Sequence, residues 1–146
     1  MLIGEYESRL TEKNRIAVPA KIRTELKNNL IIARGYEGCL LLLDEQRWKD
    51  LVELISVKPL LNLSARDTRR FIMGSAHEIE LDSQGRFVLP VILRQYAQIE
   101  MMVTFVGIMD WVEVWAQETW QKKIIELGKS AADIAERLMQ GNGNKT

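Results

Sequence analysis

The chain has 146 residues, 47% of them hydrophobic, and its 20 Lys and Arg residues balance its 20 Asp and Glu residues. A net charge of zero argues against an indiscriminate polyanion binder, and one cysteine allows no internal disulfide. The longest apolar run, Cys39 to Leu43, is too short to span a bilayer, and the N-terminus lacks the layout of a signal peptide. These features predict a cytoplasmic protein.

The first half of the chain predicts short strands and helices in alternation. Strands are expected at 2–10, 15–18, 30–33 and 39–43, from their alternating or continuous apolar residues. Pro19 begins a short helix that ends near Leu26, because proline fits the first turn of a helix. Asp44 is positioned to cap a second helix, which runs to about Val57.

The second half predicts the same order of elements after a helical connection. Ser64 resembles the start of a capping box and opens a helix to about Met73. Gly128 is expected to break the last helix of the second half, and Ser130 to open a separate C-terminal helix. The predicted units are a first repeat at 1–57, a helical connection at 58–73, a second repeat at 74–127, and a C-terminal helix with a frayed tail at 128–146.

An internal repeat explains this parallel. Residues 82–94 align with residues 11–23 at a period of 71, the spacing from Thr11 to Asp82. The alignment superposes Arg15 on Arg86, Pro19 on Pro90 and Arg23 on Arg94, and one extra residue shifts the offset to 72 beyond them. Because a repeat dictates architecture, the two halves are expected to form equivalent units that share a core.

Each copy predicts a turn, a short strand and a helix. In the second copy Asp82 can accept from backbone N–H groups, Gly85 supplies the positive φ of the turn, and Arg86 begins the strand. The first copy has Thr11 in place of the aspartate and Asn14 in place of the glycine, and Asn tolerates the left-handed region.

Several motifs together resemble those of MraZ proteins, over residues 1–127. They are the tandem Asp-x-x-Gly-Arg-x-x-x-Pro stretches, the turn at 35–40, Ser75-Ala76-His77-Glu78 and Glu113-Val114-Trp115. MraZ proteins are bacterial DNA-binding transcriptional regulators of the AbrB-like class. The resemblance implies an α+β fold, a pseudo-two-fold swapped-hairpin β-barrel built from two tandem repeats and flanked by helices. It also implies a nucleoid-associated, ring-shaped homo-oligomer that binds short repeated motifs in promoter DNA, upstream of division and cell-wall genes including its own.

Charge is distributed unevenly between the copies. Residues 9–34 hold seven Lys or Arg and two Asp or Glu, whereas residues 80–105 hold two and three. The asymmetry predicts that only the first copy faces a polyanion. Arg15 is the candidate for a phosphate or guanine contact, with phosphate contacts from Lys13, Lys21 and Arg23. Asn14 reaches a base or shapes the turn, and we favour the turn.

Other polar residues have alternative interpretations. Arg86, beside Glu80 and Asp82, braces its turn or contacts DNA, and we favour bracing; Asp82 and Gly85 are structural turn residues. A further set forms a phosphate patch, a contact between protomers or a solvated helix face: Arg66, Arg69 and Arg70. His77 has no His or Cys nearby in the sequence, so no metal site is expected.

Three other functions compete with DNA binding. An oligomeric scaffold of the same fold and an antitoxin-like regulator, whose tail binds a toxin, are the alternatives. An enzyme is disfavoured because the sequence has no Gly-rich phosphate loop, nucleophile elbow or His/carboxylate dyad. Neither a cofactor nor a small-molecule substrate is therefore expected.

Overall fold

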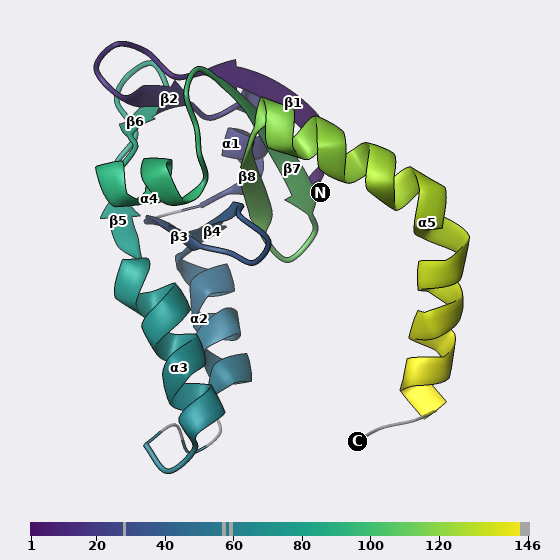
Figure 1. Cartoon of the computed structure of the whole chain (residues 1–146). Helices are drawn as coiled ribbons and strands as arrows, with labels where there is room; N and C mark the ends of the chain where they lie inside the picture. The colour runs from purple at the N-terminus through teal and green to yellow at the C-terminus, as the bar shows by residue number, and fades with distance from the viewer. Residues whose placement is uncertain (28, 57, 59, 144–146) are drawn as a thin grey trace.

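The computed structural model describes residues 1–27, 29–56, 58 and 60–143, with 142 and 143 described for their backbone alone. Figure 1 shows the arrangement of the elements. In chain order they are β1 (Ile3–Arg9), β2 (Arg15–Ala17), α1 (Ala20–Glu25), β3 (Leu30–Arg34), β4 (Leu40–Asp44), α2 (Glu45–Ile55), α3 (Leu63–Ile72), the 3₁₀ turn η1 (Met73–Ser75), β5 (His77–Ile79), β6 (Arg86–Val88), α4 (Val91–Tyr96), β7 (Met102–Ile108), β8 (Val112–Ala116) and α5 (Gln117–Gly143).

The fold is α+β, with an antiparallel six-stranded sheet in the order β1-β7-β8-β4-β3-β5. The sheet does not close: within the described residues β1 and β5 are its edges, and β2 pairs with β6 in a separate two-stranded ladder. The closed barrel that the resemblance implied is therefore not seen as one hydrogen-bonded sheet. Pro19 and Pro90 follow these strands closely, and proline lacks the N–H that would extend a ladder.

The two halves of the chain exchange strands. β1 of the first half pairs with β7 of the second, and β5 of the second half pairs with β3 of the first. Two ladders join equivalent positions directly: Ile16 lies opposite Phe87, at the offset of 71, and Leu41 lies opposite Glu113, at the offset of 72. The halves are thus related by a pseudo-two-fold axis that passes through both ladders.

The main core lies between the inner face of the sheet, the β2–β6 ladder and the short helices. Ile16 and Phe87 from the ladder, Ile22 from α1 and Leu93 from α4 are all at most 1% exposed. A smaller cluster joins Cys39, Val106, Trp115 and Trp120, where α5 crosses the sheet. The inner face of the ladder therefore packs on core side chains from both halves, and its outer face is the one that faces solvent.

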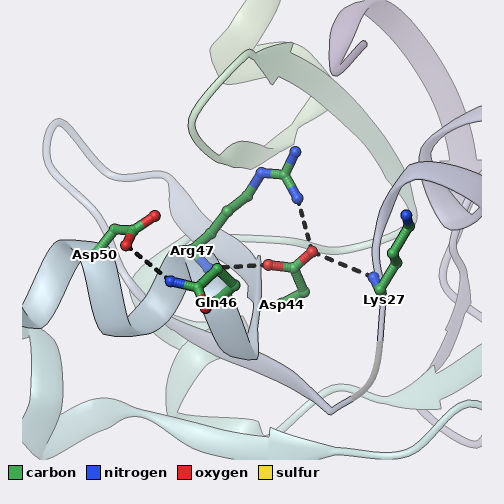
Figure 2. Close-up of polar contacts among 5 residues, drawn as sticks. All are labelled: Lys27, Asp44, Gln46, Arg47 and Asp50. Carbon is green, nitrogen blue, oxygen red and sulfur yellow. Dashed lines mark hydrogen bonds and ion pairs between the residues drawn. The ribbon is translucent and has the colours of Figure 1, made fainter.

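Helix α2 begins as the sequence predicted. The buried carboxylate of Asp44 accepts from the backbone N–H of Arg47 at 3.0 Å and from its Nη1 at 2.7 Å (Figure 2). The same carboxylate accepts from the backbone N–H of Lys27 at 3.2 Å, and Gln46 bonds Asp50 on the exposed side of the helix. Helix α2 ends at Ile55, and the predicted end near Val57 lies outside the described residues.

Two predictions about helix ends were wrong. Helix α3 begins at Leu63, and its cap is Asn62, whose side chain accepts from the backbone N–H of Ala65 at 3.0 Å. Ser64 is already the second residue of the helix and so does not cap it. Helix α5 continues through Gly128 and Ser130 without a break. A glycine inside a helix costs only about 1 kcal/mol, which the surrounding helix-forming residues offset.

Helix α5 leaves the body of the protein after its first turns. It crosses β7 and β8 and then extends well away from the sheet, whereas α2 and α3 lie together below β3 and β4 (Figure 1). Residues 141–143, which were expected to fray, belong to α5, and residues 144–146 lie outside the described part of the chain.

Candidate nucleic-acid interface

The β2–β6 ladder forms a two-stranded ribbon with one buried and one outer face. Side chains alternate along each strand, so Ile16 and Phe87 enter the core. The outer face therefore carries the residues on either side of them: Arg15, Ala17, Arg86 and Val88. Arg15 lies opposite Val88 and Arg86 lies opposite Ala17, so the two arginines sit diagonally on the same face. A β-ribbon of this kind has the width to enter the major groove of DNA.

The first turn, residues 11–15, presents Lys13 at its exposed tip. The backbone N–H of Asn14 donates to the carbonyl of Thr11 at 3.0 Å, and the N–H of Thr11 donates to the carbonyl of Arg15 at 2.9 Å. Asn14 has a φ of +57°, in the left-handed region that Asn tolerates better than most residues. Asn14 thus has the backbone conformation that the turn requires, which fits the turn-shaping role.

The second turn, residues 82–86, is closed by the carboxylate of Asp82. It accepts from the backbone N–H groups of Gln84 and Arg86, each at 2.9 Å, and from Nε of Arg86 at 3.0 Å. The hydrogen bond from the Arg86 N–H, helped by the other donors and the guanidinium charge, lowers the pKa of Asp82 below its ordinary value. Gly85 supplies the positive φ, +75°, that this turn needs. The geometry fits a bracing role for Arg86.

The equivalent turns differ in what neutralises their arginine. At the position of Asp82 the first turn has Thr11, whose Oγ1 accepts from the backbone N–H of Arg15 at 3.2 Å. Arg86 forms an ion pair with Asp82. Across the described ranges of the chain, no carboxylate forms an ion pair with Lys13 or Arg15. The first turn thus exposes cationic groups that an anionic partner can reach.

The structure does not bring all of the predicted DNA-binding residues together. Lys13, Asn14 and Arg15 lie together at the end of the ribbon where β2 begins. Arg23 lies at the other end, where its guanidinium approaches the backbone of Gly85 and its Nη1 donates to the carbonyl of Val18 at 3.0 Å. Lys21 is exposed on α1. Because β2 carries the chain from the first turn to the opposite end of the ribbon, and α1 follows there, proximity in sequence did not bring Arg23 beside Lys13.

A contact that the sequence did not reveal joins the first turn to the second half of the chain. Arg94, on α4, donates from Nη1 to Oδ1 of Asn14 at 2.8 Å and from Nε to the carbonyl of Ile99 at 3.1 Å. The internal repeat contained the signal, since Arg94 is the equivalent of Arg23, but no local pattern links Arg94 to a turn 80 residues away.

The arginines of α3 are held within the α2–α3 unit. Arg66 donates to the carbonyl of Leu60, Arg69 donates to Oγ of Ser56, and Arg70 pairs with Asp67. Within the described part of the chain, no group of three or more His, Cys, Asp or Glu side chains is arranged to hold a metal ion.

Fold and site together define a class of protein: a duplicated chain whose halves exchange strands and present one cationic turn on a two-stranded ribbon. A family model described as "MraZ protein, putative antitoxin-like" matches residues 1–71 and again residues 72–142. The chain belongs to the MraZ family.

Curated relatives support this assignment over most of the chain. A protein of Caldanaerobacter subterraneus subsp. tengcongensis is 37% identical over 138 residues, which cover 94% of this chain and 96% of the relative. Relatives from Clostridium beijerinckii and Lactiplantibacillus plantarum are 42% and 39% identical, covering 84% and 95% of this chain and 86% and 99% of their own lengths. All three are named "Transcriptional regulator MraZ". Of the helices in the described residues, none has the length and apolar character needed to cross a membrane.

Proposed function

We propose that the protein is a transcriptional regulator that binds promoter DNA through the outer face of the β2–β6 ribbon. Arg15 contacts a phosphate or a guanine edge, and Lys13 adds a phosphate contact at the tip of the first turn. Lys21 supplies a further phosphate contact from α1. Arg23, the member of this set that lies against the second turn, is assigned to supporting that turn.

One observation carries the proposal: the two equivalent turns differ in the neutralisation of their arginine. Asp82 holds Arg86 at 3.0 Å, while Thr11 leaves the Arg15 guanidinium without such a partner in the described structure. A guanidinium beside a tight turn is preorganised for bidentate contact with an oxyanion, because the backbone that carries it is fixed. The cationic turn is thus suited to a phosphate or to the edge of a base.

Affinity is proposed to come from several copies acting together. One protomer offers few cationic contacts, so its own binding is weak and sensitive to salt. A ring-shaped homo-oligomer would present several first turns to one duplex, and linked weak contacts produce a large gain in avidity. The expected target is a short motif repeated along a promoter, in front of division and cell-wall genes and the protein's own gene.

The test is the binding of a labelled duplex from the region upstream of the protein's own gene, followed by fluorescence anisotropy. Arg15→Ala is expected to abolish specific binding while the circular dichroism spectrum and oligomer mass stay unchanged. Arg137→Ala removes the same charge from the exposed distal half of α5 and is expected to bind as the unmodified protein does. Equal affinity of the unmodified and Arg15→Ala proteins would refute the proposal.

The exposed apolar side chains of α5 favour a second candidate, an oligomeric scaffold that works through protein contacts. Ile134, Leu138 and Met139 are 37%, 63% and 73% exposed on the half of α5 that extends from the body. The same surface suits an antitoxin-like regulator that holds a toxin. A plot of log affinity against log salt separates these functions from DNA regulation, because counterion release gives a steep negative slope only for the latter.

A further inference from the structure

Each short helix carries an arginine that reaches the turn of the opposite half. Arg94 of α4 donates from Nη1 to Oδ1 of Asn14 at 2.8 Å, and its Nε is held by the carbonyl of Ile99 at 3.1 Å. An arginine has only donors, so the oxygen of the Asn14 amide must face it. The guanidinium therefore links α4 to the first turn in a defined orientation.

Asn14 is fixed to its surroundings at three points. Its N–H donates to the carbonyl of Thr11 at 3.0 Å, and its carbonyl accepts from the N–H of Leu89 at 2.7 Å. The third point is the side-chain bond to Arg94. Lys13 and Arg15 flank Asn14 directly, so the orientation of both cations depends on how firmly Asn14 is held in its left-handed conformation.

The second turn shows what the equivalent arginine does when the turn has no side chain at this position. The N–H of Val18 donates to the carbonyl of Gly85 at 2.9 Å, which mirrors the bond between Leu89 and Asn14. A Cβ on Gly85 would lie 2.1 Å from Nη1 of Arg23, so the guanidinium occupies the space that the Asn14 side chain fills in the first turn. The equivalent arginines therefore make a packing contact with Gly85 in one turn and a hydrogen bond with Asn14 in the other.

We infer that Arg94 is a positioning residue for the DNA-binding turn of the opposite half, acting through its hydrogen bond to Asn14. The inference rests on the proposed function of that turn, but the bond can be tested without DNA. Two of the Arg94 nitrogens are committed to protein oxygens, so its role is to hold the turn rather than to contact a phosphate. Asn14 and Arg94 line a hollow of about 560 Å³ together with Thr11 and Met101. Water can therefore take the place of the hydrogen bond when a substitution removes it.

The first experiment measures amide hydrogen exchange of the free protein in the segment 12–16. Arg94→Ala is expected to speed exchange there by about tenfold, as loss of one hydrogen bond to a charged group allows. Asn14→Gly breaks the same bond without touching α4 and is expected to act alike, which covers the case of an Arg94 variant that does not fold. The matched control Arg137→Ala leaves the segment unchanged. Unchanged exchange in both Arg94→Ala and Asn14→Gly would overturn the inference.

The second experiment measures DNA affinity as a function of salt. Arg94→Ala is expected to lose about tenfold in affinity with the slope of log affinity against log salt unchanged, whereas loss of a phosphate contact lowers that slope by about 1. Arg94→Lys keeps the charge but cannot make both hydrogen bonds, so it should behave like the alanine variant. A reduced slope for Arg94→Ala, with affinity restored in Arg94→Lys, would identify a direct phosphate contact and refute the positioning role.

A double-mutant cycle completes the test. If Arg94 acts through Asn14, the variant that carries both Arg94→Ala and Asn14→Gly binds DNA no more weakly than either single variant. Additive losses would mean that the residues act independently and would overturn the inference. If the unmodified protein shows no salt-dependent DNA binding, the proposed function fails, and the exchange experiment alone decides whether Arg94 holds the turn.

Discussion

The residues at the equivalent positions Thr11 and Asp82 should determine which of the two turns binds DNA. In the second turn the Asp82 carboxylate accepts from Nε of Arg86 at 3.0 Å; in the first, the Thr11 hydroxyl accepts from the backbone N–H of Arg15 and not from its guanidinium. Thr11→Asp therefore gives Arg15 an internal partner that competes with phosphate. The loss of one charge-assisted hydrogen bond to DNA predicts about a tenfold drop in affinity per site, and loss of one phosphate contact predicts a slope of log affinity against log salt that is less steep by about 0.9.

The assay is fluorescence anisotropy over a series of salt concentrations, with thermal unfolding measured in parallel. Stability should change little, because ion pairs as exposed as Arg86 and Asp82 add little. Thr11→Asn is the uncharged control and should bind as the unmodified protein does. The reverse change, Asp82→Thr, frees Arg86 on the same outer face and should steepen the slope. If Thr11→Asp binds with unchanged affinity and slope, the neutralisation argument is refuted.

Three further predictions concern the fold that carries the ribbon. Asp44→Ala removes the cap of α2 and leaves the guanidinium of Arg47 without its carboxylate partner. It should lower the free energy of unfolding, measured in urea, by about 2 kcal/mol. Asp44→Asn can still cap the helix and should lower that free energy by less. Gly85→Ala forces a Cβ into a φ of +75° and against Arg23, and should lower the melting temperature, whereas a rise would contradict the contact. Burial raises the pKa of the Cys39 thiol, so the folded state favours the neutral form. The free energy of unfolding should therefore fall as the pH rises above the ordinary thiol pKa. The thiol of the folded protein should also resist a disulfide reagent until the protein unfolds.

Features set by neighbouring residues could be predicted from the sequence. The Asp82 turn and the Asp44 cap depend on atoms within four residues of the carboxylate, and both were anticipated. The period of 71 also indicated that the halves are equivalent, and the structure pairs Ile16 with Phe87 at that offset. Local chemistry and the repeat therefore accounted for the turns and the equivalence of the halves, whereas the separate β2–β6 ribbon was not predicted.

Features that depend on tertiary contacts or on small energy differences were not predictable. The basic residues of 13–23 looked like one cluster, but β2 separates them, and Arg23 on α1 lies at the end of the ribbon opposite the first turn. The bond between Arg94 and Asn14 joins residues 80 positions apart, and no local sequence pattern indicates it. Helix α5 continues through Gly128 because a modest helix penalty is outweighed by the residues on both sides.

The direct pairing of Ile16 with Phe87 and of Leu41 with Glu113 has an evolutionary consequence. These contacts resemble those of a symmetric dimer, in which the same surface of each subunit meets its own copy. In such a dimer, every substitution at the interface changes both subunits. Fusion of the two copies into one chain removes that restriction, because each half can then change alone. In this chain one half has a glycine and an aspartate at its turn and the other has Asn14 and Thr11, so the two halves differ in how the turn is supported and in the charge that it exposes.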